Sequence, residues 1–221
     1  MTGSKLSGAA YNTSMDFLHL PRGLYAIVDS TERAGAALEG GAAVVQLRIK
    51  RAGAGEILNT AREIRALCNG RAVFIMNDRP DIARLSDADG VHLGQDDLPV
   101  AAARAIVGPG KLVGVSTHSD QELDAALAAG ADYLGFGPIF ATASKETALP
   151  PPHGLEALAR AVRRAGEVPV VAIGGITSAT VREVVATGAR GAAAIAELSR
   201  DTLAARRFAE AFRAPVAAWQ G

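Results

Sequence analysis

The sequence predicts an α/β protein whose single compact domain is a closed (β/α)8 barrel. From Leu24 onward, short β-branched runs alternate with Ala-rich segments of helical period, and Gly, Asn, Asp or Pro marks the junctions. The apolar runs number eight, and their continuous apolar character indicates parallel strands covered on both faces. Closing eight such strands leaves no sheet edge, as in a TIM barrel. A doubly wound open sheet is the alternative.

The eight predicted strands follow one another at short intervals. They are LYAIVD (24–29), VVQLRIK (44–50), AVFIMN (72–77), GVHLG (90–94), LVGVS (112–116), YLGFGPIF (133–140), PVVAIGGI (169–176) and GAAAIAE (191–197). Helical segments between them include EILNTAREIRALC (56–68), DQELDAALAAG (120–130), GLEALARAVRRAG (154–166) and SATVREVVATG (178–188), several of which end on Gly. In such a barrel, functional groups are expected at the carboxyl ends of the strands.

The composition excludes several classes of protein. The 221 residues are 49% hydrophobic, which is enough for a large core, and the formal net charge of +0 gives no general attraction to nucleic acid or anionic lipid. The single cysteine, Cys68, lies in a helical pattern and is expected to be a small buried side chain in a reducing compartment. No stretch resembles a signal peptide or a membrane span, so a cytoplasmic protein is expected. We expect residues 1–22 to form a loosely ordered arm and residues 23–215 to form the catalytic barrel.

The second predicted strand carries polar residues on one face. Because side chains alternate along a strand, three polar residues share the face turned into the barrel, namely Gln46, Arg48 and Lys50. The other face is apolar and suits the helix layer; it holds Val45, Leu47 and Ile49. Two cations inside a barrel are costly unless they are paired. They therefore either form internal ion pairs or bind an anion.

Carboxylates follow the third and fourth predicted strands. Asn77 and Asp78 end one strand, and the pair Asp96 and Asp97 follows the next. Each group precedes a proline, so either could simply begin a helix. However, neighbouring strands would bring Asp78 close to one of the two later aspartates, and facing carboxylates repel unless a cation or a proton lies between them. Few oxygen ligands beside a phosphate-binding surface are typical of Mg²⁺.

The remaining strand ends add hydroxyls, one cation and glycines. Ser116 ends the fifth strand, and the long loop after the sixth holds Thr142, Ser144 and Lys145. Gly174 and Gly175 after the seventh strand can present backbone N–H groups to a phosphate. Among the histidines near the mouth, His92 is expected to be hydrogen-bonded inside the barrel and His118 to have no catalytic role. The rim as a whole predicts a phosphorylated substrate and a diphosphate.

Seven segments, in this order and spacing, resemble the thiamine phosphate synthase family. They are VQLRIK, NDRPDIA, ADGVHLGQDD, GVSTH, ADYLGFGPIFATASK, VAIGGI and the Gly-rich start of the eighth strand. The resemblance covers roughly residues 23–200. It implies a transferase that joins hydroxymethylpyrimidine diphosphate to hydroxyethylthiazole phosphate, giving thiamine monophosphate and pyrophosphate with Mg²⁺ as cofactor. It also implies that the pyrophosphate leaves before the thiazole nitrogen attacks, so that no general base is required.

The resemblance also implies roles for individual residues. The metal ligands would be Asp78 and Asp97. Pyrophosphate contacts would be Arg48, Lys50, Asn77, Ser116 and Lys145, of which all but Asn77 would be catalytic. Gln46 would contact the pyrimidine. The thiazole phosphate would be held by Thr142 and Ser144, and by the backbone at Gly175, Ile195 and Ala196.

Two departures from the family pattern concern the thiazole phosphate. Ser144 stands where the family usually has Thr, and Ala196–Glu197 stand where it usually has Ser and a small residue. Glu197 would repel a phosphate unless it turns away or meets an Arg. The rival functions are a thiazole tautomerase, which would carry His in place of Pro138 and lack the paired aspartates, and a non-catalytic barrel that binds thiamine precursors. A homo-oligomer is possible; the partners expected otherwise are small molecules.

Overall fold

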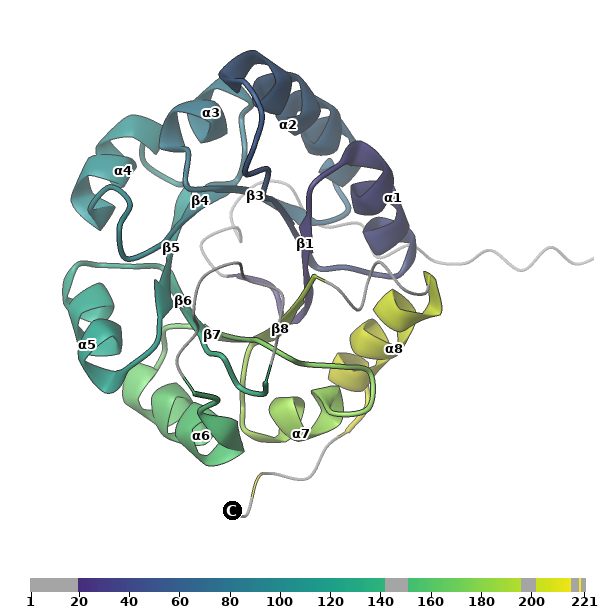
Figure 1. Cartoon of the computed structure of the whole chain (residues 1–221), viewed down its shortest axis with the longest axis vertical. Helices are drawn as coiled ribbons and strands as arrows, with labels where there is room; N and C mark the ends of the chain where they lie inside the picture. The colour runs from purple at the N-terminus through teal and green to yellow at the C-terminus, as the bar shows by residue number, and fades with distance from the viewer. Residues whose placement is uncertain (1–19, 142–150, 196–201, 216–218, 220–221) are drawn as a thin grey trace, which may run out of the picture.

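The eight predicted strands form one closed parallel barrel, in the order in which they occur along the chain. The computed structural model describes residues 20–141, 151–195, 202–215 and 219. Down the barrel axis, the strands form a ring and the helices surround it (Figure 1). The (β/α)8 prediction is therefore confirmed, and the open doubly wound sheet is excluded, because β1 pairs with β8.

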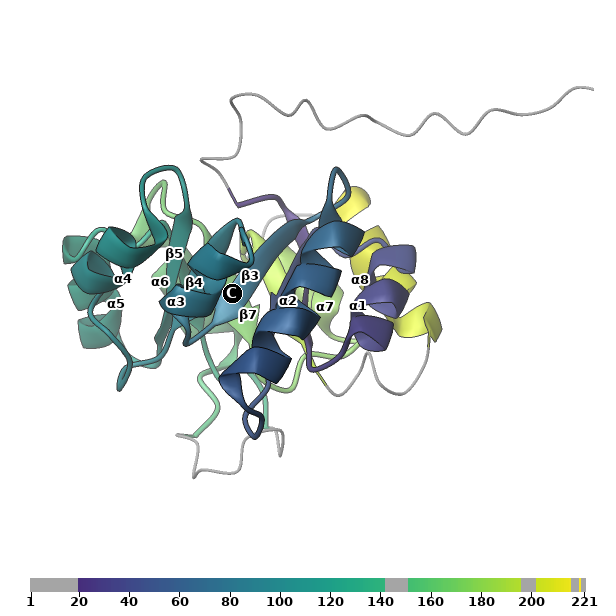
Figure 2. The same cartoon turned by 90° about the horizontal axis from the view of Figure 1, so that it is seen from above.

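The strands are short and each is followed by one helix. The strands are β1 (Gly23–Val28), β2 (Val44–Leu47), β3 (Val73–Asn77), β4 (Gly90–Leu93), β5 (Leu112–Thr117), β6 (Tyr133–Phe136), β7 (Val170–Ile173) and β8 (Gly191–Ala194). The helices are α1 (Thr31–Glu39), α2 (Ala54–Cys68), α3 (Pro80–Leu85), α4 (Val100–Val107), α5 (Asp120–Ala128), α6 (Gly154–Ala165), α7 (Val181–Ala186) and α8 (Thr202–Arg213). Figure 2 shows these helices flanking the strands in the perpendicular view.

Several strands end earlier than the sequence predicts. Strand β2 stops at Leu47, so that Arg48 to Lys50 lie beyond it, and β6 stops at Phe136 rather than continuing to Phe140. A run of apolar or β-branched residues gives no sign of where ladder pairing stops. Because β2 ends at Leu47, Arg48 and Lys50 lie on the rim and not deep inside the barrel.

Alternation along the strands divides the core into two clusters. Val45 and Leu47 belong to the cluster between the strands and the helices, as predicted, and Ile49 packs against it. A second cluster fills the barrel interior and includes Tyr25, Ile75 and Tyr133. Gln46 also lies inside and is 2% exposed. The predicted orientations of Gln46, Val45 and Leu47 are therefore confirmed, and apolar Val44 shares the inner face with Gln46.

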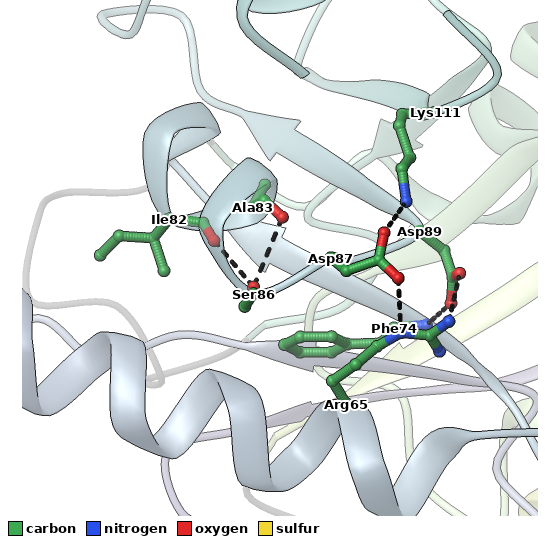
Figure 3. Close-up of polar contacts among 8 residues, drawn as sticks. All are labelled: Arg65, Phe74, Ile82, Ala83, Ser86, Asp87, Asp89 and Lys111. Carbon is green, nitrogen blue, oxygen red and sulfur yellow. Dashed lines mark hydrogen bonds and ion pairs between the residues drawn. The ribbon is translucent and has the colours of Figure 1, made fainter. Parts of the chain in front are cut away.

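At the amino ends of two strands, an aspartate side chain accepts a hydrogen bond from the backbone of the neighbouring strand. Asp89 precedes β4, and its Oδ2 accepts the backbone N–H of Phe74 in β3 at 2.8 Å. Arg65 of α2 lies 3.6 Å from the other oxygen of Asp89, as Figure 3 shows. Asp132 repeats the arrangement before β6, accepting from the backbone N–H of Val113 at 2.7 Å and from Arg104 at 2.6 Å. Each aspartate thus joins two neighbouring strands and a helix at the face opposite the strand carboxyl ends.

We expect Asp132→Ala to lower the free energy of unfolding by about 2–3 kcal/mol, because the Val113 N–H and the Arg104 guanidinium would both lose a partly buried partner. Denaturant unfolding measures this change. The matched control is Asp124→Ala, which breaks the exposed pair of Asp124 with Arg164 and should leave the unfolding midpoint unchanged. Equal effects of the two substitutions would contradict the proposed function of Asp132 in joining the strands.

The described residues also bear on three other predictions. Cys68 is fully buried, and burial raises the pKa of its thiol to about 12. Leu20, within the segment expected to be an arm, is 1% exposed and belongs to the interior cluster. Residues 1–19 lie outside the described residues. Within the described part of the chain, no helix combines the length and the apolar character needed to cross a membrane.

Candidate active site

Strand register brings the predicted polar residues of β2, β3 and β4 to one side of the barrel mouth. Gln46 pairs with Ile75, and Leu47 pairs with Met76, so Arg48 follows the ladder next to Asn77. Asn77 in turn pairs with His92 of β4. The carboxyl ends of three consecutive strands therefore meet where Arg48, Asn77 and Asp78 leave the sheet, as the sequence predicts.

A tight turn directs Asp78 at the end of β3. Its backbone N–H continues the ladder by donating to the His92 carbonyl at 2.8 Å, and the next N–H, of Arg79, folds back to the Asn77 carbonyl at 2.8 Å. Asp78 has φ 59°, a left-handed conformation that costs a residue with a Cβ of order 1 kcal/mol. Helix α3 starts at Pro80 with no side-chain cap, so Asp78 is not a helix cap. The turn instead places its carboxylate at the mouth.

Asp97 is fixed by the loop after β4. Its Oδ2 accepts the backbone N–H of Gly94 at 2.6 Å. Helix α4 begins at Val100 without a side-chain cap, so the capping alternative is excluded for Asp97 as well. Of the two aspartates in this loop, Asp97 is the one that acts on Asp78, whereas Asp96 is exposed. The structure therefore selects Asp97 as the partner of Asp78.

The two carboxyl groups are close enough to perturb each other. The pKa of Asp78 is raised to about 6, chiefly by partial burial and in addition by a hydrogen bond with Asp97 and by the negative charge of Asp97. The positive charge of Arg48 and a hydrogen bond from Asn77 act in the opposite direction. A carboxylate pair of this kind is stabilised by a proton or by a cation between the two groups.

The donor set fits Mg²⁺ better than a metal held entirely by protein ligands. Within the described ranges, no group of three or more His, Cys, Asp or Glu residues could hold a metal ion. Mg²⁺ is commonly bound through one or two carboxylates, with the remaining positions filled by water and substrate phosphates. Asp78 and Asp97 could supply those carboxylates.

Arg48 lies close enough to Asp78 to affect its pKa. Its backbone N–H donates to the Val28 carbonyl at 2.8 Å, which fixes the start of the loop. Its side chain is half-buried, and it forms no ion pair with any residue that the structure describes. Its positive charge acts on Asp78, and its contact with a bound anion stays a prediction. Lys50 is exposed on the same loop.

Ser116 lies near the end of β5, the strand next to β4 in the barrel. Its Oγ lies 2.9 Å from His92 Nε2, and its backbone carbonyl accepts from Gln95 Nε2 at 2.6 Å. His92 is hydrogen-bonded inside the barrel, as predicted. His118, by contrast, turns to Glu122 in the first turn of α5, with 3.0 Å between Nδ1 and Oε2. That His118 has no catalytic role stays a prediction.

The ends of β7 and β8 form the other side of the rim. Gly174 and Gly175 have φ 98° and 64°, and a Cβ on Gly175 would lie 2.5 Å from the Ala141 carbonyl oxygen, so glycine is required there. Ile173 pairs with Ala193, which places this turn beside Ile195, directly after β8. Glycine lets this turn pack closely against Pro138, Phe140 and Ala141, and a contact of its backbone with a phosphate stays a prediction.

Several predicted site residues fall outside the described part of the chain. They are Thr142, Ser144, Lys145, Ala196 and Glu197. Their proposed contacts with substrate stay predictions, as does the effect of Glu197 on a bound phosphate.

The sequence interpretation missed two tyrosines that line the interior. Tyr25 Oη and Tyr133 Oη lie 2.8 Å apart, and Gln46 Nε2 donates to Tyr25 Oη at 2.8 Å. Tyr133 Oη also lies 3.0 Å from His92 Nδ1. The alternation of side chains along the first strand could have revealed Tyr25. It lies two positions from Ile27, and both side chains face the barrel interior. A hydroxyl-bearing aromatic on the inner face of a strand indicates a polar interior.

Comparison with known proteins agrees with this geometry. The family model described as thiamine monophosphate synthase matches residues 24–198. The chain is 54% identical over 177 residues to the thiamine-phosphate synthase of Anaeromyxobacter dehalogenans, covering 78% of each chain. It is 44% identical over 206 residues to that of Myxococcus xanthus, covering 88% of this chain and 94% of the other.

A solved structure supports the same assignment. The thiamine phosphate pyrophosphorylase of Pyrococcus furiosus superposes with a TM-score of 0.79 at 36% sequence identity, covering 88% of this chain and 96% of that one. Because the family model matches most of the barrel and the similarity to the curated relatives extends over most of both chains, the chain belongs to the thiamine-phosphate synthase family.

Proposed function

We propose that this protein joins 4-amino-5-hydroxymethyl-2-methylpyrimidine diphosphate to 4-methyl-5-hydroxyethylthiazole phosphate, releasing pyrophosphate and forming thiamine monophosphate. The observation that carries the proposal is the Asp78–Asp97 pair beside Arg48, at the mouth of a barrel whose family carries this activity. Two carboxylates and a cation available for an anion suit a magnesium diphosphate, and they suit an isomerase without a diphosphate substrate poorly.

The reaction breaks the bond between the pyrimidine methylene carbon and a diphosphate oxygen. The electron pair leaves with the pyrophosphate, and the thiazole nitrogen then uses its lone pair to form the new bond to that carbon. A ring nitrogen without a proton needs no general base for its attack. Catalysis then depends on stabilising the charge of the leaving group and on aligning the two substrates.

Residues of this chain would divide these tasks between the two sides of the mouth. Arg48, Lys50, Asn77 and Ser116 would contact the pyrophosphate, joined by Lys145. Gln46, held inside the barrel, would contact the pyrimidine. Asp78 and Asp97 would hold Mg²⁺, which when bound supplies positive charge to the pyrophosphate oxygens.

The thiazole phosphate would lie on the opposite side. The positive-φ turn at Gly174 and Gly175 lies beside Ile195, and main-chain N–H groups of this part of the rim would hold the phosphate. Thr142, Ser144 and Ala196 complete the proposed set. We assign the catalytic domain to residues 23–215, with residues 1–22 as an arm, and we propose a cytoplasmic enzyme that is able to form a homo-oligomer.

A direct assay tests the proposed function. Purified protein is supplied with the pyrimidine diphosphate, the thiazole phosphate and Mg²⁺; thiamine monophosphate is followed by chromatography and pyrophosphate by a coupled reaction. We expect the two products in equal amounts. If neither product forms although calorimetry detects binding of a substrate, the protein is a binding barrel and the proposal is wrong.

A further inference from the structure

A chain of hydrogen bonds crosses the barrel interior and ends at Ser116. It runs from Gln46 through Tyr25, Tyr133 and His92, with donor–acceptor distances of 2.8, 2.8, 3.0 and 2.9 Å. Its members come from β2, β1, β6, β4 and β5, so that five of the eight strands contribute. The proposed function assigns roles to the two ends, Gln46 and Ser116, and leaves the three residues between them without one.

The two tyrosines are built into the fold. Tyr25 and Tyr133 are 2% and 0% exposed, and their ring centroids lie 6.1 Å apart. Gly114 in β5 makes room for the Tyr133 ring, because a Cβ at that position would lie 2.1 Å from Tyr133 Cζ. Burial raises the pKa of both hydroxyl groups above their usual range. Each therefore keeps its proton at physiological pH and must place it on an acceptor.

The direction of the chain follows from the Gln46 amide. Since Gln46 Nε2 donates to Tyr25 Oη, and Tyr25 has Tyr133 as its other hydrogen-bond partner among the described residues, the Tyr25 proton goes to Tyr133. Tyr133 then donates to His92 Nδ1. That ring nitrogen is consequently unprotonated, and the proton of the neutral imidazole lies on Nε2, facing Ser116 Oγ.

The direction of the hydrogen bonds determines how Ser116, the last residue of the chain, uses its own proton. Ser116 Oγ accepts from His92 Nε2, so its own proton is not used within the chain and is directed elsewhere. In the opposite direction, Ser116 would donate to His92 and would present only lone pairs at the mouth, which would repel an anion. The direction of the internal chain thus decides whether Ser116 is a hydrogen-bond donor to a phosphate.

We propose that Tyr133, which accepts from Tyr25, is a positioning residue that fixes His92 as the Nε2–H tautomer, and that His92 thereby makes the Ser116 hydroxyl a donor to the diphosphate. This inference rests on the proposed function for the identity of the anion, but the tautomer itself does not depend on turnover. The aromatic residues act through Ser116, and they need no contact with the diphosphate.

The tautomer is measured directly by ¹⁵N NMR of the histidine side chains in the substrate-free protein, because protonated and unprotonated ring nitrogens have distinct chemical shifts. His92 is assigned by comparison with His92→Gln. We expect Nε2 to be protonated and Nδ1 to be unprotonated. Protonation of Nδ1, alone or together with Nε2, overturns the proposal. This measurement uses the unmodified protein and gives an answer even if the protein forms no thiamine monophosphate.

Two tyrosine variants then test the direction. Tyr133→Phe removes the donor to His92 Nδ1 and should give a mixture of tautomers. Tyr25→Phe should keep the Nε2–H tautomer, because Tyr133 still donates to His92. The matched control is Thr117→Val in β5, the strand of Ser116. It removes a buried hydroxyl that donates to the Gly135 carbonyl, and it should leave the His92 tautomer unchanged. A tautomer change in Tyr25→Phe but not in Tyr133→Phe would contradict the assigned direction.

A double-mutant cycle relates the tautomer to anion binding and rate. Tyr133→Phe should lower kcat, and the affinity for inorganic pyrophosphate with Mg²⁺, by about tenfold, the size typical of residues that orient a ligating group. In a Ser116→Ala background the same substitution should change either quantity by less than about twofold, because its effect passes through Ser116. Additive losses would overturn the positioning role. Pyrophosphate binding keeps the cycle informative if the protein lacks the proposed activity.

Discussion

Asp78→Asn is expected to lower kcat by at least about 100-fold while making the metal-free protein more stable. The activity falls because the asparagine keeps an oxygen ligand but loses the negative charge that would hold Mg²⁺ beside the leaving pyrophosphate. Steady-state assays over a range of Mg²⁺ concentrations, with an EDTA-treated sample as the zero point, measure this loss. Half-saturation should move to higher Mg²⁺ concentrations.

The gain in stability follows from the sign of the pKa shift. The pKa of Asp78 is raised from 3.8 to about 6 in the folded protein, so the folded state binds more protons than the unfolded state between these values. Stability of the metal-free protein therefore declines as the pH rises through this window, and at neutral pH the ionised Asp78 destabilises the fold. Because the carboxylate is partly exposed to solvent, we expect Asp78→Asn to recover only on the order of 1 kcal/mol.

Asparagine is the appropriate replacement because it tolerates the left-handed backbone at φ 59° better than alanine does. The matched control is Asp81→Asn, which removes a carboxylate three positions away that pairs with Arg79 at the start of α3. This control should retain full activity. An active Asp78→Asn protein, or one that is less stable than the parent at pH 7.5 in EDTA, would contradict the metal-site assignment.

The pH dependence of stability should also differ between the parent and Asp78→Asn, which gives a second test of the metal-site assignment. Thermal unfolding in EDTA should show the parent losing stability between about pH 4 and pH 6, whereas Asp78→Asn lacks this dependence. Saturating Mg²⁺ should remove most of the difference between the two proteins at neutral pH, because a bound cation relieves the repulsion between Asp78 and Asp97.

The barrel could be predicted because its signals are local. Each strand is a short apolar run, and each run is bounded by residues that favour turns. The position of Asp78 at the rim could be predicted for the same reason, whereas the sequence predicts Arg48 within the second strand and the structure places it just beyond the strand end. The alternative interpretations of Asp78 and Asp97 as helix caps could not be excluded from sequence, because a cap and a metal ligand use the same residue type beside the same proline.

The interior hydrogen bonds could not be predicted, because they are not local. Tyr25 and Tyr133 are 108 positions apart, and their contact requires both the closed barrel and the space left by Gly114. The proton direction along the chain depends on the orientation of the Gln46 amide, which no sequence pattern encodes. A lone histidine in a strand is usually a structural residue; here it is hydrogen-bonded inside the barrel and also connects to Ser116.

Arg48→Met is expected to lower kcat/KM by roughly 100-fold or more, the size found when a donor to a developing negative charge is removed. Methionine has a similar length without the charge, so the loop that begins with the backbone bond from Arg48 to Val28 should persist. The substitution also acts on the metal site: Arg48 lowers the pKa of Asp78, and without this neighbouring positive charge Asp78 should bind both a proton and Mg²⁺ more tightly. Steady-state kinetics at several Mg²⁺ concentrations separate the two contributions.

Arg48→Lys distinguishes charge from geometry. Lysine restores the positive charge and its effect on Asp78, but it lacks the planar fork that contacts two phosphate oxygens at once. We therefore expect the Mg²⁺ dependence to recover fully and kcat/KM to recover only in part. The control Arg62→Met, on the exposed surface of α2, should match the parent in both. If Arg48→Met matched the parent as well, Arg48 would have no part in binding the pyrophosphate, and the charge on the leaving group would have to be stabilised by the remaining cations of the rim.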